Sequence, residues 1–211
     1  MKINLLDSGK RYNRNWIFKN FTYSFISGKR YAILGPNGSG KSTLIKVISG
    51  YLMQSEGRVE YIQNDEQIPI EKTYQYISFT APYIELLEEF TVKEQIDFHL
   101  KFRKLAFNYT TEDVLDLLKF RDHSNKMLKN LSSGMRQRLK LALTILSDVP
   151  VLLLDEPATN LDAQGVEWYR DLIEKYSSDK IVIVASNRAD EYDFCEEKIN
   201  IVNYKKVTVM P

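Results

Sequence analysis

The alternation of apolar and polar residues predicts β-strands in the first third of the chain. Phe21, Tyr23 and Phe25 alternate with polar residues, which is the period of a strand that buries one face. Three further strands are expected from short runs rich in aromatic and β-branched residues, at 30–34, 58–62 and 74–79. A polar loop is expected at 63–72, and helical spacing at 43–48 follows the strand at 30–34.

From Thr91 to about Leu146 the apolar residues recur at the three- and four-residue spacing of amphipathic helices. The residues that carry this spacing are Val92, Ile96 and Leu100, then Val114, Leu115 and Leu118, then Leu139, Leu143 and Leu146. We therefore expect a helical subdomain, residues 82–148, inserted between two parts of one core.

The last third returns to strands that alternate with a helix. The predicted elements are a buried strand at 151–154, a helix at 163–176, a buried strand at 181–185, and short strands at 198–202 and 206–210. Strands that alternate with helices predict a parallel sheet covered on both faces. We expect residues 1–211 to form one domain, with an α/β core of 1–81 and 149–211.

Composition excludes several classes of protein. The net charge of +1 gives no electrostatic case for binding nucleic acid. The one cysteine, Cys195, excludes an internal disulfide and fits a reducing compartment. The first residues are too weakly apolar for a signal peptide, and no run approaches the ~20 apolar residues of a membrane span. These features fit a cytoplasmic protein. If it acts at a membrane, we expect it to do so through a partner.

Residues 35–42 fit the phosphate-binding pattern G-x-x-x-x-G-K-[ST] at every fixed position. Its glycines leave room for phosphate against the backbone, and the following helix start attracts an anion. Lys41 adds a positive charge for the terminal phosphates, and the Ser42 hydroxyl suits Mg²⁺. The expected nucleotide contacts are Gly35, Pro36, Asn37, Gly38, Ser39, Gly40, Lys41, Ser42 and Thr43. A chance glycine-rich turn is disfavoured by the strand before it and the helix after it.

Two carboxylates follow the buried strand at 151–154. Ligands of open α/β sheets bind at the carboxyl ends of strands, so Asp155 is placed to hold Mg²⁺, directly or through water. Glu156 is placed to polarise a water for attack on the γ-phosphate. Alone, such a pair is weak evidence, because many strands end in an acid before a turn. Together with residues 35–42 it predicts a nucleotide-hydrolysing site.

Leu131-Ser132-Ser133-Gly134 precedes the third helical segment. By itself, this stretch is explained by a serine helix cap. However, the order of residues 35–42, then 131–135, then 151–157, then Asn160-Leu161-Asp162 resembles the ATP-binding-cassette (ABC) ATPases over nearly the whole chain. The resemblance implies the α/β fold of P-loop NTPases, with a mainly parallel sheet, an antiparallel N-terminal β part and an inserted α-helical subdomain.

The resemblance assigns roles to individual residues. Residues 35–42 correspond to the Walker A loop, Asp155 to the Walker B acid and Glu156 to the catalytic glutamate. Residues 160–162 resemble the D-loop. Residues 131–135 resemble the signature Leu-Ser-Gly-Gly-Gln with changes at 133 and 135, so Ser132, Ser133 and Gly134 are expected to contact ATP. Tyr12 lies where the family stacks an aromatic ring on adenine, with Trp16 as the alternative; strand packing would also explain either ring.

The family's geometry implies a head-to-tail dimer that sandwiches ATP and Mg²⁺ between subunits, either as a homodimer or as a cassette heterodimer. It also implies a transmembrane permease encoded as a separate chain, which would hold this protein on the cytoplasmic face of a membrane. The apolar and acidic segment 82–90 lies where the family docks a short helix of that partner. Inward packing of its apolar residues is the alternative explanation.

Two positions depart from the family pattern. A glutamine that senses Mg²⁺ is replaced by Ala81 or Pro82, and Gln75 is set aside because it falls inside a predicted strand. A histidine that contacts the γ-phosphate is replaced by Asn187, whose amide donates a hydrogen bond but carries no charge. The only histidines, His99 and His123, are expected to be surface or packing residues.

The sequence thus supports two functions. The first is an ATPase that powers transport, with Glu156, Lys41 and Asn187 in catalysis, and with slow turnover because of the two departures. The second is a nucleotide-dependent binding module that pairs with a more active cassette. Family members that act on DNA or ribosomes are disfavoured, since the chain has one cassette and no basic excess.

Overall fold

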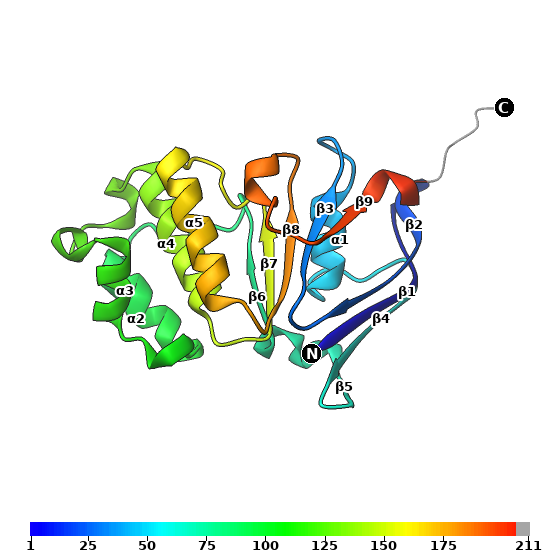
Figure 1. Cartoon of the computed structure of the whole chain (residues 1–211), viewed down its shortest axis with the longest axis horizontal. Coiled ribbons are helices and arrows are strands. Elements are labelled where there is room, and N and C mark those ends of the chain that lie inside the picture. Colours follow the sequence, from blue (N-terminus) through cyan, green and yellow to red (C-terminus); the bar gives the residue numbers. More distant parts are fainter. Residues whose placement is uncertain (206–211) are drawn as a thin grey trace. The chain divides into compact units, whose positions relative to one another are not determined.

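The computed structural model describes residues 1–205 and contains two β-sheets (Figure 1). The antiparallel sheet has the strand order β2-β1-β4-β5, and the second sheet has the order β6-β7-β8-β3-β9. The strands are β1 (Lys2–Tyr12), β2 (Asn15–Ile26), β3 (Arg30–Leu34), β4 (Glu56–Gln63), β5 (Glu66–Ile68), β6 (Ile77–Thr80), β7 (Val151–Asp155), β8 (Ile181–Ala185) and β9 (Glu197–Asn200). The helices are α1 (Lys41–Ile48), α2 (Val92–Phe102), α3 (Thr111–Leu118), α4 (Ser133–Leu146) and α5 (Ala163–Tyr176).

Strand β8 lies between β7 and β3, and it pairs with both in parallel. All side chains of β7 and β8 are buried, which explains why both strands read as unbroken apolar runs. The register pairs Asp155 with Ala185 and Ile33 with Ala185, so the carboxyl ends of these strands meet at one edge. The predicted parallel sheet is confirmed, and this edge carries the site described below.

In the antiparallel sheet, β1 pairs with β2 on one side and with β4 on the other. Phe21 and Phe25 of β2 are fully buried, and Tyr23 between them is partly buried against the same core. The alternation therefore predicted this strand correctly, and the antiparallel N-terminal part of the fold is confirmed.

Three local predictions differ from the structure. The strand expected at 74–79 begins only at Ile77, because Ile70–Gln75 is a 3-10 turn in which Thr73 Oγ1 donates to the Ile70 carbonyl (2.8 Å). The loop expected at 63–72 contains β5, which turns back from β4 at Asn64 and Asp65, both with positive φ (51° and 63°). The strand expected at 198–202 ends at Asn200, and that expected at 206–210 lies outside the described residues.

Contacts divide the chain into two compact units. The core unit contains Met1–Phe79, Val149–Glu156 and the chain from Asp179 onward. The helical unit contains Thr80–Asp148 and Pro157–Ser178. Helix α5 thus groups with the helical unit, whereas the boundaries drawn from sequence, 82–148 and 149–211, left it in the core.

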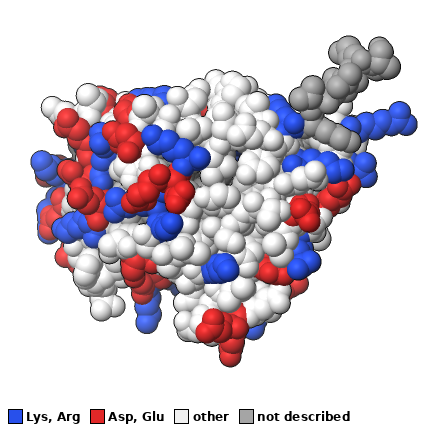
Figure 2. All heavy atoms as spheres, turned by 45° about the vertical axis from the view of Figure 1, so that its right-hand side comes forward, with Lys and Arg blue, Asp and Glu red and all other residues white. Residues whose placement is uncertain are grey.

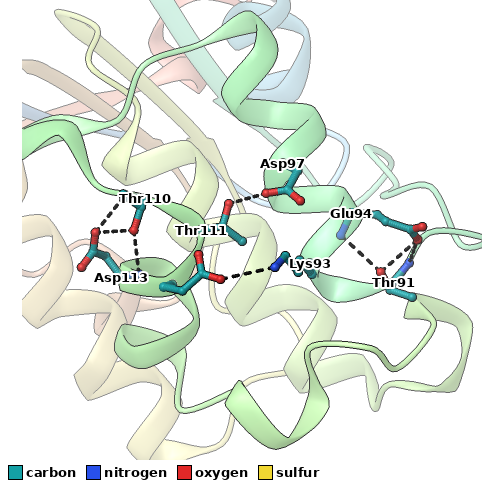
Figure 3. Close-up of polar contacts among 8 residues, drawn as sticks. Thr91, Lys93, Glu94, Asp97, Thr110, Thr111 and Asp113 are labelled. Atoms are coloured by element: carbon teal, nitrogen blue, oxygen red, sulfur yellow. Dashed lines mark hydrogen bonds and ion pairs between the residues drawn. The ribbon is translucent and has the colours of Figure 1, made fainter.

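Hydrogen bonds from threonine side chains fix the helix starts of the helical unit (Figure 3). Thr91 and Glu94 form a reciprocal capping box at α2, and Thr110 and Asp113 form another at α3. Thr111 donates to Asp97, which joins the two helices. The apolar residues that predicted the three helices are buried, apart from the partly exposed Leu100.

Candidate functional site

The loop between β3 and α1 takes a conformation that requires glycine. Gly35 and Gly40 have φ of 150° and 107°. A Cβ atom at Gly40 would lie 2.4 Å from Ile17 Cγ2, and one at Gly35 would lie 2.6 Å from Ser39 Oγ. Any side chain at either position would therefore displace its neighbours, which explains the two fixed glycines of the pattern.

This loop forms one wall of a pocket of about 220 Å³ in the core unit. The lining residues are Ile17, Asn37, Gly38, Ser39, Gly40, Lys41, Ser42, Thr43 and Glu156. The N-cap residue of α1 is Gly40, which has no side chain to cap the first N–H groups of the helix. Lys41 Nζ donates to the carbonyls of Gly35 (2.8 Å) and Pro36 (3.3 Å). The arrangement provides the fixed N–H donors and the positive charge that bind phosphate.

Asp155 ends β7 with its side chain buried, at 1% exposure. Neither carboxylate oxygen has a hydrogen-bond partner among the described residues. Burial raises the pKa of Asp155 to about 6, and the charge of Glu156 adds to this, while the nearby Ser42 hydroxyl and Lys41 partly offset it. A buried carboxylate without a partner, beside a hydroxyl, is a donor set that fits Mg²⁺.

Glu156 turns the chain immediately after β7 and lines the pocket. Its φ is 46°, in the left-handed region that costs a residue with a side chain about 1–2 kcal/mol. Its backbone N–H donates to the Ala185 carbonyl at the end of β8 (2.9 Å). The structure thus holds a carboxylate at the phosphate pocket on a strained backbone, and such strain clusters at functional sites.

Asn187 follows β8, and its amide Nδ2 donates to Asn37 Oδ1 of the phosphate loop (2.9 Å). Asn37 lines the pocket, whereas Asn187 does not. The structure therefore brings Asn187 to the phosphate loop, one hydrogen bond removed from the pocket itself.

The two candidate adenine-stacking rings lie outside the pocket lining. Tyr12 ends β1 with 50% of its surface exposed, and Lys10 Nζ lies 5.5 Å from its ring centroid. The Trp16 ring is approached by Lys19 (4.6 Å) and Arg11 (5.5 Å). Ile17 does line the pocket, and the sequence reasoning missed it. The signal in the sequence is that Ile17 is apolar although it lies on the opposite face of β2 from its neighbour Phe18, which is fully buried.

In the helical unit, the sequence 131–135 starts helix α4. Ser132 is the N-cap, and its Oγ accepts the Met135 N–H (3.2 Å), so the capping explanation holds. Ser132 and Ser133 are nevertheless exposed. A Cβ atom at Gly134 would lie 3.1 Å from the Asn160 carbonyl, so this glycine lets residues 160–162 approach the helix start. Gln137 Nε2 donates to the Pro157 carbonyl (2.5 Å) and secures the same approach.

Of the two residues that could take the place of the family's glutamine, Ala81 is buried, with 1% exposure, and Pro82 is exposed. The Ala81 carbonyl accepts a hydrogen bond from Lys140 Nζ (3.1 Å), which also donates to the Ile84 carbonyl (3.0 Å). Burial lowers the pKa of Lys140, and Glu85 opposes this. Lys140 therefore fixes the backbone of the segment that follows β6.

The histidines lie away from the phosphate loop in the sequence and play packing roles. His99 Nε2 lies 3.1 Å from Ser147 Oγ, and Ser147 itself donates to the Leu143 carbonyl (2.6 Å). Burial lowers the pKa of His99 to about 4, with a smaller contribution from Arg103. The His123 ring packs against Phe120. Among residues 1–205, no three His, Cys, Asp or Glu side chains converge as a metal site would need.

Comparison with known proteins agrees with these motifs. Residues 18–159 match the family model of the ABC transporter. Among curated proteins, the chain is 26% identical over 195 residues to the uncharacterized ABC transporter ATP-binding protein YcbN of Bacillus subtilis, covering 92% of this chain and 64% of that protein. It is 32% identical over 190 residues to the sulfate/thiosulfate import ATP-binding protein CysA of Mesostigma viride, covering 87% of this chain and 54% of that protein. The chain thus spans less than two thirds of the length of these two relatives.

Solved structures share the fold over almost the whole chain. An ABC transporter ATP-binding protein from Pyrococcus furiosus superposes with a TM-score of 0.81 at 25% identity, covering 98% of this chain and 100% of that one. The ABC transporter cassette MJ0796, in a dimeric structure, gives 0.79 at 25% identity and 94% of both chains. A dimeric post-hydrolysis structure of MJ0796 bound to ADP and Pi gives 0.81 at 24% identity, covering 94% of both chains, and supports the fold. Because the family model covers more than half of the chain and the fold agrees, this protein belongs to the ABC transporter family of ATP-binding proteins.

Proposed function

We propose that this chain binds Mg-ATP and hydrolyses it to drive an ABC transporter. One observation carries the proposal: a single pocket joins the phosphate loop, Lys41 and Glu156, and the buried carboxylate oxygens of Asp155 beside it accept no hydrogen bond from the residues that the structure describes. Phosphoryl transfer depends on positioning and on stabilising spread negative charge, and these groups supply both.

Each residue has a separate task in this proposal. The Lys41 ammonium exchanges its two loop carbonyls for phosphate oxygens, which are stronger acceptors because they carry charge. Ser42 and Asp155 would hold Mg²⁺, which when bound neutralises developing negative charge on the phosphates. Glu156 accepts a proton from the attacking water. Tyr12 stays the candidate for stacking on adenine, with Ile17 beside the phosphate loop.

The proposed working form is a dimer with ATP between the subunits. The exposed start of α4, with Ser132, Ser133 and Gly134, offers N–H donors to a nucleotide held by a second subunit. The relative MJ0796 has been solved as a dimer, in one case with ADP and Pi bound. A homodimer and a cassette heterodimer both satisfy this geometry.

The proposed partner is a transmembrane permease on a separate chain, which would keep this protein at the cytoplasmic face of a membrane. No helix among the described residues is long and apolar enough to cross a membrane.

The helical unit has a groove of about 170 Å³ lined by Pro82, Ile84, Glu85, Leu86, Glu88, Leu128, Ser133, Arg136, Gln137, Lys140 and Asn160. On the face drawn in Figure 2, the positive and negative side chains of the described residues are interspersed. The expectation that nucleic acid is not a partner stays a prediction.

The segment 82–90 is the proposed docking surface. Its apolar residues do not all pack inward: Tyr83 is 48% and Leu87 43% exposed, whereas Phe90 packs on Phe98 (5.5 Å between ring centroids). Lys140 of α4 donates to the Ile84 carbonyl (3.0 Å), and Arg136 of α4 lies 3.6 Å from Glu88. A displacement of the segment would therefore be transmitted to α4. The proposed surface is therefore connected to the residues that would meet ATP.

Substitution of Tyr83 by aspartate tests the docking surface. We expect the variant to keep its thermal stability and nucleotide affinity but to lose co-purification with the permease, because a charge replaces an exposed ring. Phe90→Asp is the contrasting variant, and we expect it to lower stability because the half-buried Phe90 ring packs on Phe98. If Tyr83→Asp still co-purifies and its ATPase is still stimulated, the docking surface lies elsewhere.

A nucleotide-dependent binding module is the second candidate, and one observation favours it. Ala81 offers only a buried methyl group where the family has a glutamine, and Asn187 offers a neutral amide where it has a histidine. Such a chain would bind ATP but hydrolyse little of it, and it would pair with a second cassette that hydrolyses ATP faster.

Steady-state ATPase of the purified chain, alone and with its co-purified permease, separates the two candidates. The enzyme predicts turnover that depends on Mg²⁺ and disappears in Glu156→Gln. The binding module predicts saturable Mg-ATP binding with no turnover above that of Glu156→Gln.

A further inference from the structure

The side chains of Asn37 and Asn187 form a direct link between two loops that lie 150 residues apart. Asn187 Nδ2 donates to Asn37 Oδ1 at 2.9 Å. Both side chains are exposed, and neither belongs to a regular element, so packing does not enforce the contact. Asn37 lines the phosphate pocket together with Lys41 and Glu156.

The backbone around Asn187 is held firmly. Ser186, which is fully buried, donates its N–H to the Ile33 carbonyl at the end of β3 (3.3 Å), and its hydroxyl accepts the Arg188 N–H (2.9 Å). Arg188 directs its guanidinium to Asp190 (2.6 Å) and Glu191 (3.7 Å). The loop therefore presents a neutral amide to Asn37, and the adjacent cation is engaged elsewhere.

The direction of the hydrogen bond between Asn187 and Asn37 determines which polar atoms of Asn37 can bind a ligand. Its amide oxygen is occupied by Asn187, so its amide nitrogen keeps two N–H donors. A donor pair at the wall of a phosphate pocket suits phosphate oxygens, and hydrogen bonds to a charged group are among the strong ones. If the polarity were reversed, Asn37 would turn its acceptor oxygen toward the anion.

We propose that Asn187 is a positioning residue that orients the Asn37 amide, and that Asn37 donates to the terminal phosphate of bound ATP. The inference rests on the proposed function of the same pocket. Together the two amides replace the single histidine of the family with a neutral relay, in which Asn187 acts on the nucleotide only through Asn37.

Equilibrium binding of Mg-ATP and of ADP, measured by calorimetry on the full chain, tests this relay. We expect Asn187→Ala and Asn37→Ala each to weaken ATP binding by about tenfold to a hundredfold, the effect of losing a hydrogen bond to a charged group. ADP affinity should change by less than about threefold, since ADP lacks the terminal phosphate. The double variant should lose no more than either single one, because the two residues act as a unit.

Two further variants of Asn187 probe the polarity of the link. Asn187→His keeps an N–H donor for Asn37 Oδ1 and should keep ATP affinity. Asn187→Asp offers only acceptors, so it should turn the Asn37 amide around and weaken ATP binding more than alanine does. Asn125→Ala, at an exposed asparagine of the helical unit, is the matched control, and the thermal midpoint of every variant checks that it folds.

Three results would each overturn the relay. The first is that the losses of ATP affinity add in the double variant, the second is that ADP affinity falls as much as ATP affinity, and the third is that Asn187→Asp binds ATP as well as the wild type. A failure of the proposed function looks different. In that case the wild type binds no Mg-ATP, or Lys41→Ala binds it as well as the wild type. If binding depends on Lys41 but not on Asn37 or Asn187, the relay alone is wrong.

Discussion

In the helical unit, the polar side chains at the helix starts hydrogen-bond to their own helices, whereas at the phosphate pocket of the core unit buried oxygens lack partners. Thr91, Thr110 and Ser132 each accept a backbone N–H of the helix that they begin. Ser39 Oγ and both carboxylate oxygens of Asp155 are buried and have no partner among the described residues.

The difference has a physical cause. A capping side chain stabilises a helix by about 1 kcal/mol in the absence of any ligand. A buried group without a partner destabilises the fold by about 1–3 kcal/mol, and such a cost is retained where a ligand supplies the missing partner. The phosphate pocket of the core unit is thus built to be completed by a ligand, whereas these three helix starts of the helical unit complete their own hydrogen bonds.

The largest expected effect is at Lys41. Lys41→Ala removes the ammonium group that donates to two carbonyls of the loop, so Mg-ATP affinity should fall by at least about a hundredfold. Lys101→Ala, at an exposed lysine of the helical unit, is the matched control and should bind normally. Calorimetry measures the Mg-ATP affinity of both variants. Unchanged affinity in Lys41→Ala would show that this pocket is not the ATP site.

Glu156→Gln should leave ATP binding intact and lower turnover by about 10²–10⁴, because the general base is lost while the side-chain volume stays. The uncleaved ATP should then hold two subunits together. Size-exclusion chromatography with and without Mg-ATP measures this, with Glu66→Gln in β5 as the control. A variant that binds ATP and stays monomeric at saturation would contradict the sandwich geometry.

Asn187 tests how far the pocket depends on its neighbouring loop. Asn187 reaches the phosphates only through Asn37, and such a neutral relay stabilises developing charge less than a charged side chain would. Losing one stabilising group costs ~10²–10³ in rate. We expect slow hydrolysis by the wild type, faster turnover in Asn187→His and the slowest in Asn187→Ala. The absence of a glutamine at Ala81 affects the same reaction, so the effects of the two positions on turnover need not be additive. Equal kcat values in all three proteins would show that Asn187 has no influence on catalysis.

The smallest effect concerns His99 in the helical unit. The unfolded chain protonates this histidine below about pH 6.5, whereas burial lowers the folded pKa to about 4. The contribution of His99 to the free energy of unfolding should therefore be fully present above pH 6.5 and decrease by at most about 3 kcal/mol as the pH falls to about 4. Urea unfolding across this range should show the decrease in the wild type and in His123→Gln but not in His99→Gln. The same slope in His99→Gln would place its origin elsewhere.

Local sequence determined much of this fold. The unbroken apolar runs of β7 and β8 predicted buried strands, because a strand covered on both faces has no polar side. The glycines of residues 35–42 predicted the phosphate loop, because positive φ and close approach exclude other residues. Turns were harder to predict: β5 was missed because its short strand is formed by pairing with β4 rather than by its own composition.

Tertiary structure decided which residues meet. Ile17 lies in β2 of the antiparallel sheet and Glu156 follows β7 of the other sheet, and only the tertiary fold of the core unit brings them to the same pocket. The link from Asn187 to Asn37 depends on β8 and β3 being neighbours, and no local pattern at either residue encodes it. The sequence by itself determined the kinds of chemical group available, since motifs specify residue types at fixed spacing. Partners, burial and pKa were set by the packing of distant segments, because these properties depend on which atoms surround a group.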